Sequence, residues 1–248
     1  MNKKYFHLII SLTIFLILWE LTGYYIGKEY ILPLPASILK FILVNWKSIF
    51  FIHFPATASI MLSSLSIAIV LGILLAFLMD KYTVLENLFY PIIVITQTLP
   101  IIAIAPVFIL WFGYSIWSKI IVVVLMVFFP ITVNVLEGLK SIKREYLELF
   151  ISLKATEKDK FYKLKVFAVL PYFFSALKIA IPFSLTGATV GEWLGAQKGL
   201  GYLSKRMMTQ LDGPGIFAPI IILSLFAIIS VQIITFIENK YIHWRREL

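Results

Sequence analysis

The chain has 248 residues, of which 60% are hydrophobic and only 14% are charged, and its mean hydropathy is +0.94. A water-soluble domain averages about 45–50% apolar and about 25% charged residues, so this composition excludes a soluble globule and predicts an integral membrane protein. The net charge of +9 does not indicate nucleic acid as a partner, because basic residues gather at the cytoplasmic ends of membrane helices. The absence of cysteine excludes disulfides and thiol catalysis.

Apolar runs long enough for membrane helices of about 20 residues recur along the whole chain. They lie at about 5–26, 55–79, 88–112, 117–139, 168–193 and 215–238. The first run follows two lysines, as a signal peptide does, but it exceeds the usual apolar length of about 7–15 residues and no small-residue cleavage site follows it. The sequence therefore predicts an all-α integral membrane fold of about six transmembrane helices, forming a single domain over residues 1–248.

The distribution of Lys and Arg predicts that both termini are cytoplasmic. With that orientation, about twice as many of the 22 basic residues lie inside as outside, in agreement with the positive-inside rule. Lys178 falls within a span, where we expect it to reach the interface or form an ion pair. The basic residues expected outside are Lys28, Lys40, Lys47, Lys119, Lys198, Lys205 and Arg206.

Two connections are long enough to have structure of their own. Residues 38–52 are apolar but too short for a crossing, so we expect a helix lying in the membrane interface. The loop between the fourth and fifth spans, about 140–167, has eight basic and four acidic residues and no Gly or Pro. Its spaced apolar residues predict one or two short amphipathic helices on the cytoplasmic side.

The chain lacks the motifs of several enzyme and carrier classes. It has no G-x-x-x-x-G-K-[ST] loop for nucleotide phosphates and no H-E-x-x-H metal motif, so we expect neither enzymatic activity nor a cofactor or metal in this chain. Acidic residues are missing from the middles of the spans, where a proton-coupled carrier usually keeps its relay. A proton-coupled secondary carrier remains the alternative from another class.

A few side chains within the spans are candidates for a solute pathway, because each is polar or amphipathic in an apolar run. For Gln97 and Glu192 a purely structural hydrogen bond is an equally good interpretation. Glycines that recur every four residues predict close helix packing, and they are Gly187, Gly191 and Gly195. Prolines 91, 100 and 106 interrupt the third span and free backbone carbonyls, which suggests that this span lines protein or a cavity. The pathway candidates are Gln97, Trp111, Asn134, Thr189 and Glu192.

Several stretches together resemble a known family. LPIIAIAPVFILWFG (99–113), KIIVVVLMVFFPITVN (119–134), LPYFFSALK (170–178) and GEWLGAQKGLGY (191–202) resemble permease subunits of bacterial ABC importers. The branch is the binding-protein-dependent one that takes up sulfonates, nitrate, riboflavin or thiamine precursors. The resemblance covers nearly the whole chain from Leu32 onward.

The polar loop extends the resemblance. In this family, a cytoplasmic loop with an E-A-A, three residues, G signature docks on the ATPase subunit, and the matching segment here is Glu148–Thr156. Leu149 and Phe150 replace the two alanines, and Lys154 replaces the glycine, which removes a residue that tolerates positive φ. The resemblance assigns docking on the ATPase to Glu148, Leu149, Phe150, Leu153, Lys154, Ala155, Thr156 and Phe161.

Family membership would also imply the partners and the solute. It implies a second permease copy in a homodimer, two ATP-binding subunits that hold ATP and Mg, an extracytoplasmic solute-binding protein, and the lipid of a bacterial cytoplasmic membrane that the chain crosses several times. Residues 191–202 look most like the subgroup for pyrimidine precursors of thiamine, with riboflavin permeases next. An aliphatic sulfonate or nitrate is the alternative solute.

Overall fold

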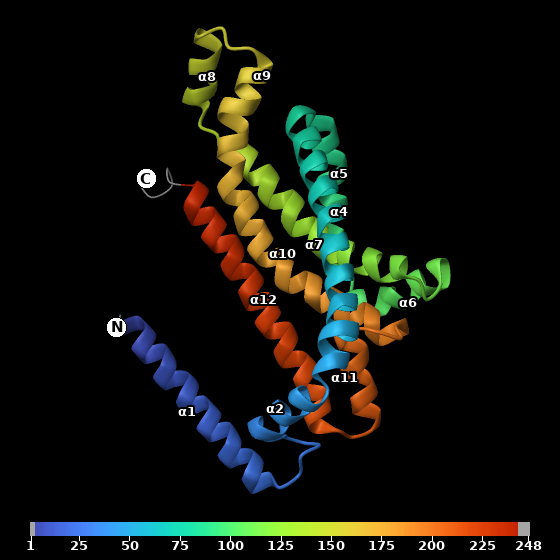
Figure 1. The fold of residues 1–248 in the computed structure, drawn as a ribbon. Coiled ribbons are helices and arrows are strands. Elements are labelled where there is room, and N and C mark those ends of the chain that lie inside the picture. Colours follow the sequence, from blue (N-terminus) through green and yellow to red (C-terminus); the bar gives the residue numbers. More distant parts are fainter. Residues whose placement is uncertain (1–2, 243–248) are drawn as a thin grey trace. The chain divides into compact units, whose positions relative to one another are not determined.

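A computed structural model describes residues 3–242 of the chain, and every regular element in that range is helical (Figure 1). The expected all-α fold is confirmed. The elements are α1 (Lys3–Ile26), α2 (Pro35–Val44), α3 (Trp46–Ser48), the π-helical turn η1 (Ile49–His53), α4 (Phe54–Lys81), α5 (Thr83–Thr98), α6 (Ile101–Phe112), α7 (Ile116–Lys140), α8 (Arg144–Ser152), α9 (Glu157–Lys160), the π-helical turn η2 (Phe161–Lys165), α10 (Val166–Gly195), α11 (Leu200–Thr209) and α12 (Gly213–Tyr241).

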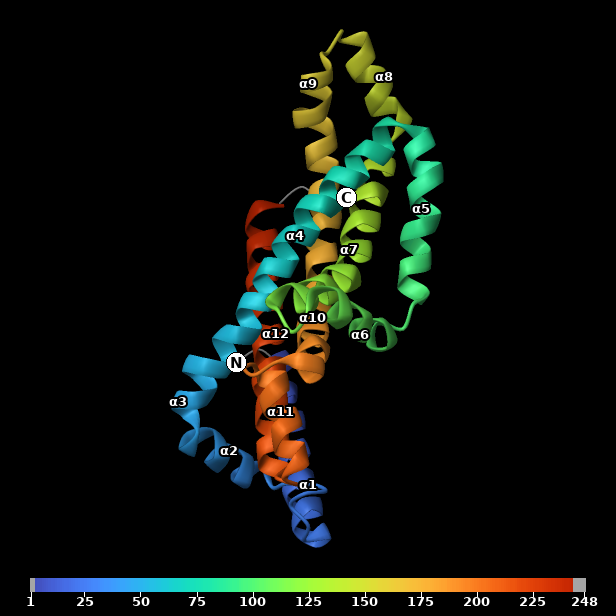
Figure 2. The ribbon, with the colours of Figure 1, turned by 90° about the vertical axis from the view of Figure 1, so that its right-hand side faces the viewer.

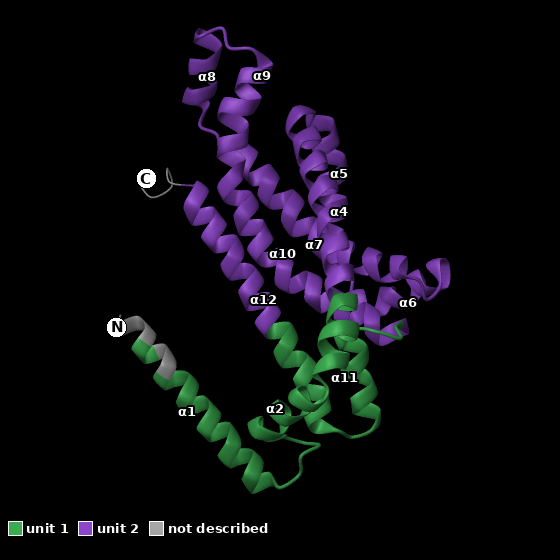
Figure 3. Ribbon diagram, viewed as in Figure 1, with its two compact units in different colours: residues 1–57, 196–224 green, residues 58–195, 225–248 purple. Residues whose placement is uncertain are grey.

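The helices group into two compact units (Figure 3). Unit 1 comprises residues 1–57 and 196–224, and unit 2 comprises residues 58–195 and 225–248. Unit 2 holds most of the apolar helices and the polar loop, whereas unit 1 holds α1, α2 and α11. That the chain forms a single domain over residues 1–248 stays a prediction.

Four helical segments of the described chain are long and apolar enough to cross a membrane: Trp46–Lys81, Ile116–Lys140, Glu157–Gly195 and Gly213–Tyr241. The pair α5 and α6 passes the same test when taken together, but the two helices are bent by 103°. The described apolar part of α1, Ile10–Ile26, is shorter than these spans. By length and composition, the described residues contain four crossing helices, or five if the bent pair is one span, so the expected number of about six stays a prediction.

The third expected span, 88–112, is not one continuous helix. Helix α5 ends at Thr98, Leu99 and Pro100 have extended backbones with ψ of 125° and 102°, and α6 begins at Ile101. Pro100 offers no backbone N–H, and its ring keeps the preceding residue out of the helical region. The expectation of one continuous helix over residues 88–112 was therefore wrong, although the bent pair taken together is long and apolar enough for one span.

The expectation of one interfacial helix over residues 38–52 was also wrong. Asn45, with φ of −101° and ψ of 14°, ends α2, and its side-chain Nδ2 donates to the carbonyl of Phe41 (3.0 Å). From Trp46 onward, α3, η1 and α4 run without a break to Lys81. The second half of the expected helix is thus the beginning of a long apolar span.

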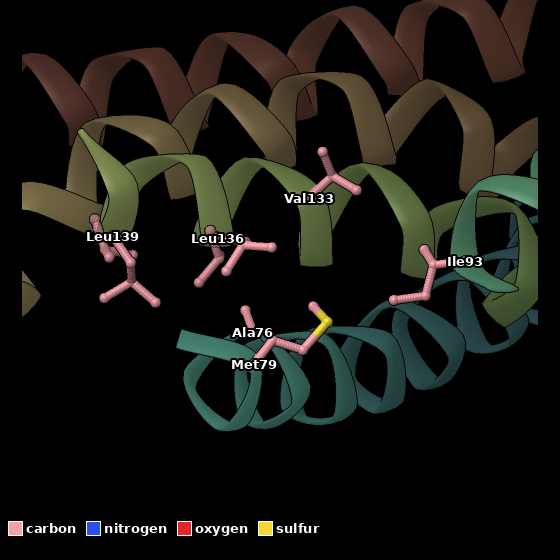
Figure 4. Close-up of a cluster of buried hydrophobic side chains, with 8 residues drawn as sticks. Ala76, Met79, Ile93, Val133, Leu136 and Leu139 are labelled. Atoms are coloured by element: carbon pink, nitrogen blue, oxygen red, sulfur yellow. The ribbon is translucent and has the colours of Figure 1, made fainter. Parts of the chain in front are cut away.

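Helices α7 and α10 lie side by side and form the most extensive helix contact in unit 2 (Figures 1 and 2). Glycines allow this close approach, since a Cβ at Gly138 would lie 3.1 Å from the Cα of Val169 and one at Gly187 would lie 2.8 Å from the Sδ of Met126. A cluster of buried side chains covers the other side of α7 (Figure 4). It consists of Ala76, Met79, Ile93, Val133, Val135, Leu136, Leu139 and Val169.

Ion pairs between helices neutralise charges at the edges of unit 2. Lys178 on α10 pairs with Glu238 on α12, which is the pairing expected as one possibility for this lysine. Lys140 pairs with Glu86 on α5, and Lys165 Nζ lies 2.5 Å from Asp80 Oδ2 on α4. A charge near lipid is costly unless it is paired, so these contacts restrict how the helices can separate.

The close packing of α10 against α7 predicts the effect of Gly191→Val. A Cβ at Gly191 would lie 3.2 Å from the Cβ of Lys119, so the larger side chain must push the helices apart, at a cost of about 1–3 kcal/mol. We expect a lower melting temperature for the purified protein in detergent, followed by tryptophan fluorescence. Ala103→Val, on the exposed side of α6, should leave the melting temperature unchanged, and equal values for both variants would contradict the packing.

Candidate functional site

The polar loop between α7 and α10 folds into a short helical hairpin, seen at one end of unit 2 in Figures 1 and 2. Helix α8 follows α7 after three residues, and α9 leads through η2 into α10 without a break. The expectation of one or two short helices in this loop is confirmed. The hairpin is thus joined directly to α10 and, through three residues, to α7.

Lys154 lies where the family signature has glycine, and it adopts the backbone conformation that glycine favours. Its φ is +50°, in the left-handed region. The N–H of Lys154 donates to the carbonyl of Ile151 and the N–H of Ala155 to that of Phe150, both at 2.9 Å. These two bonds form a Schellman motif that ends α8, in which the residue at positive φ is usually glycine. The turn is therefore kept despite the substitution, at a cost in backbone strain.

The first turn of α9 is fixed by a capping box. Thr156 Oγ1 accepts from the N–H of Asp159 (3.2 Å), and the Asp159 carboxylate accepts from the hydroxyl (2.6 Å) and the N–H (3.3 Å) of Thr156. The Lys163 ammonium, 2.7 Å away, and the Thr156 hydroxyl lower the pKa of the Asp159 carboxyl to about 2. The carboxylate is thus ionised at physiological pH and the cap is maintained.

The hairpin exposes apolar side chains. Leu149 is 50% exposed and Leu153 is 69% exposed, whereas Phe150 is half-buried. Glu148 is exposed and pairs with Arg144 within α8 (2.9 Å). Neighbouring apolar side chains exposed on a polar loop are typical of a protein interface.

Phe161, one of the residues expected to dock on the ATPase, also contacts another helix of unit 2. Its ring lies 5.1 Å from the ring of Phe77 on α4, and it remains 36% exposed. With the ion pair between Lys165 and Asp80, this contact joins the base of the hairpin to α4. Of the docking residues expected from the sequence, Phe161 is thus also part of the packing within unit 2.

A cavity of about 640 Å³ lies beside the hairpin, between the end of α7 and the beginning of α10. It combines aromatic rings with polar groups, and its lining includes a carboxylate and two lysines. The residues around it are Asn134, Glu137, Ser141, Ile142, Lys143, Tyr146, Lys163, Leu164, Phe167, Ala168, Pro171, Tyr172 and Ser175. Asn134 is the one residue in this lining that the sequence marked as a pathway candidate.

The other pathway candidates lie apart from this cavity. Gln97 is exposed at the end of α5, and Trp111 on α6 is 70% exposed. Thr189 donates its hydroxyl hydrogen to the carbonyl of Leu185 (2.9 Å), so its polar group is used within α10. Glu192 is buried, with 1% exposure, towards the other end of α10. The structure therefore does not bring the five candidates into one site.

Glu192 has a neighbour that the sequence did not indicate. Lys119, one of the basic residues expected on the outer side, is only 7% exposed and lies opposite Gly191, the chain neighbour of Glu192. Lys119 Nζ also donates to the carbonyls of Tyr114 (3.2 Å) and Ser115 (3.0 Å). At Gly195, a Cβ would lie 2.3 Å from Cδ1 of Tyr114, so the glycine leaves room for the connection between α6 and α7. In the sequence, Lys119 lies only three residues after the start of α7, and nothing at that position indicated that it would be buried.

An all-helical fold with several apolar spans and an exposed helical hairpin between two packed spans is that of a membrane transport permease. The chain belongs to the family described as the binding-protein-dependent transport system inner membrane component, whose profile matches residues 68–243. It is accordingly the permease subunit of an ABC importer.

Relatives that match most of the chain are transport permeases. The formylaminopyrimidine transport permease protein ThiX of Halalkalibacterium halodurans is 51% identical over 94% of this chain and 93% of its own length. The riboflavin transport system permease protein RibX of Chloroflexus aurantiacus is 28% identical over 95% of this chain and 88% of its own length. The putative aliphatic sulfonates transport permease protein SsuC of Bacillus subtilis is 28% identical over 72% of this chain and 63% of its own length.

The strained turn after α8 predicts the effect of Lys154→Gly. Relief of the left-handed strain, about 1–2 kcal/mol, exceeds the added chain entropy of glycine, about 0.5–1 kcal/mol. We expect the amides of residues 154 and 155 to exchange hydrogen more slowly, about twofold to fivefold. Lys154→Ala keeps the Cβ and should exchange as the wild type does. Equal rates in all three proteins would show that the turn carries no strain.

Proposed function

We propose that this chain is the membrane subunit through which an ABC importer moves a formylaminopyrimidine, a precursor of thiamine, into the cell. The observation that carries the solute assignment is the 51% identity, over nearly the full length of both chains, with the formylaminopyrimidine permease. The riboflavin relative, at 28% identity, supports riboflavin as the second candidate solute.

A partner must bind ATP, because this chain has no phosphate-binding loop. The hairpin of α8 and α9 suits the contact with that partner, since it exposes Leu149 and Leu153 next to charged residues. Its turns are fixed by the Schellman motif at Lys154 and the capping box at Thr156. A docking element fixed in this way passes motion of the partner to the membrane helices rather than absorbing it.

The motion then follows the packing of unit 2. Closure of the two ATPase subunits displaces the hairpin, and α10 moves with it because α9 continues through η2 into α10, while α7 follows through the three residues that join it to α8. The ring contact of Phe161 with Phe77 and the ion pair of Lys165 with Asp80 include α4 in that movement. The spans thereby alternate between openings to the two sides of the membrane.

The orientation follows from the same docking contact. The hairpin meets a cytoplasmic ATPase, so the connections at the opposite ends of α7 and α10 face outward, and both termini are cytoplasmic. This agrees with the distribution of Lys and Arg. The complete importer contains a second permease copy, two ATPase subunits and an extracytoplasmic solute-binding protein.

The cavity beside the hairpin has the chemistry for the inner end of the solute pathway. The rings of Tyr146 and Tyr172 offer flat surfaces for a heterocycle, and the Glu137 carboxylate can accept hydrogen bonds from an exocyclic amino group. Asn134 donates its Nδ2 to the carbonyl of Pro130 (2.7 Å), which leaves its amide oxygen as a further acceptor. A pyrimidine with amino substituents presents the matching donors.

The docking role predicts that Leu153→Asp uncouples the permease from its ATPase. A carboxylate on the exposed apolar surface of the hairpin must be desolvated in the complex, so we expect recovery of the ATPase with the tagged permease to fall by about tenfold. Leu153→Met keeps the apolar surface and should preserve recovery. Recovery of the ATPase with Leu153→Asp at the wild-type level would refute the docking role.

The solute assignment predicts the outcome of a competition experiment. Cells that contain the permease with its ATPase and binding protein should accumulate labelled formylaminopyrimidine, and excess riboflavin or taurine should not reduce the uptake. The measurement is initial uptake rate with and without each competitor. Uptake that riboflavin abolishes, or that never exceeds the rate in cells without the permease, would contradict the assignment.

A further inference from the structure

Unit 1 contains a short helix, α11, that side chains from a distant part of the chain fix in place. The N–H of Gly199 donates to Nδ1 of His53 (3.2 Å), and the N–H of Leu200 donates to Oγ1 of Thr57 (2.8 Å). The two acceptors thus cap the beginning of α11 from η1 and the start of α4. His53 is 6% exposed and Thr57 is 1% exposed, so both hydrogen bonds are shielded from water.

Apolar contacts complete the anchorage of α11. Ile49 and Leu200 are fully buried in one cluster, and the ring of Tyr202 stacks on that of His53 with 6.0 Å between the centroids. Leu203 and Met207 continue the buried face of the helix. The opposite face is exposed, and because the helix cannot rotate or slide, the position of its exposed side chains is fixed.

The segments around α11 carry an excess of positive charge. In residues 27–53 and 196–212 the basic residues are Lys28, Lys40, Lys47, Lys198, Lys205 and Arg206, and the acidic ones are Glu29 and Asp212. Both acidic groups accept hydrogen bonds within the chain, Glu29 from the Ser37 hydroxyl (2.6 Å) and Asp212 from the N–H of Gly215 (3.0 Å). Among the residues that the structure describes, Arg206 forms no ion pair.

This excess opposes the usual tendency of membrane proteins. Helix α10 crosses the membrane once between the hairpin and α11, so with the orientation proposed above α11 lies outside. Short external segments normally contain few Lys and Arg, because these residues favour the cytoplasmic side. A basic external surface therefore requires another reason, and binding of an acidic partner supplies one.

Leu211, just after the end of α11, has a strained backbone, which points to a contact with another molecule next to the basic residues of α11. Leu211 has a φ of +54° and is 70% exposed, although glycine or asparagine would adopt this conformation at lower cost. Met208, one turn earlier, is 48% exposed. Basic and apolar side chains exposed together are typical of a protein interface, where Arg and Met are enriched.

We infer that the exposed side chains of α11 and of the turn after it, Lys205, Arg206, Met208 and Leu211, form the docking surface for an acidic face of the solute-binding protein. This inference rests on the proposed function, since it needs the importer and its orientation. The basic pair attracts the acidic partner, and Leu211 contributes an apolar contact at the edge. His53 and Thr57 act as positioning residues, because they hold the helix on which the surface lies.

The test measures binding of the importer's fluorescently labelled solute-binding protein to the permease–ATPase complex in lipid nanodiscs. Lys205→Glu with Arg206→Glu should weaken binding by about tenfold or more at low salt and reduce its dependence on salt between about 50 and 200 mM. Lys40→Glu with Lys47→Glu makes the same charge change on α2 and α3 and should leave binding within about threefold. Equal weakening by both pairs, or none by the first, would overturn the inference.

A second variant separates docking from folding. Leu211→Gly relieves the left-handed strain, so we expect an unchanged or higher melting temperature together with weaker binding. Binding at the wild-type level would overturn the role of Leu211. Co-purification of the ATPase with these variants should match the wild type, and a wild-type chain that recovers no ATPase would refute the proposed function rather than this surface. Protection of the α11 amides from hydrogen exchange by anionic lipid alone, and not by the solute-binding protein, would also overturn the inference about this docking surface.

Discussion

The close packing of α7 against α10 is the contact on which the rest of unit 2 depends. Gly138, Gly187 and Gly191 bring the two helices so near that any larger side chain at these positions would meet the opposite helix. The hairpin joins the ends of this pair, so its position and that of the two spans are linked by the chain itself. The cavity with Asn134 and Tyr172 opens between the same two helices. In the function proposed here, docking, coupling and solute passage all involve this one helix pair.

The positions and partners of the charged side chains support an importer that takes its energy from a partner protein. Within unit 2, charged groups near the apolar helices have partners within the chain: Lys178 pairs with Glu238, and Lys119 donates to the carbonyls of Tyr114 and Ser115. Paired charges restrict relative movement of helices and do not form a chain for proton transfer. The exposed charges lie instead on the hairpin and around α11, where protein partners meet the permease in the arrangement proposed here.

The sequence predicted what depends on local patterns. Apolar length gave the spans, the spaced apolar residues of the loop gave its short helices, and the family signature identified the turn at Lys154, which keeps a left-handed backbone without glycine. Features that depend on tertiary contacts were not predictable in this way. The prolines of the third span indicated an interruption but not a bend of 103°, because proline also occurs inside the unbroken helices α7 and α10, and the burial of Lys119 arises from the approach of α10. The capping of α11 by His53 joins residues 146 positions apart.

The most direct test of the account is transport by proteoliposomes that contain the permease, its ATPase and its solute-binding protein. Accumulation of labelled formylaminopyrimidine should require ATP on the side of the ATPase and should continue when a protonophore removes the proton gradient. Accumulation that needs the gradient and proceeds without ATP would identify a proton-coupled carrier and contradict the account.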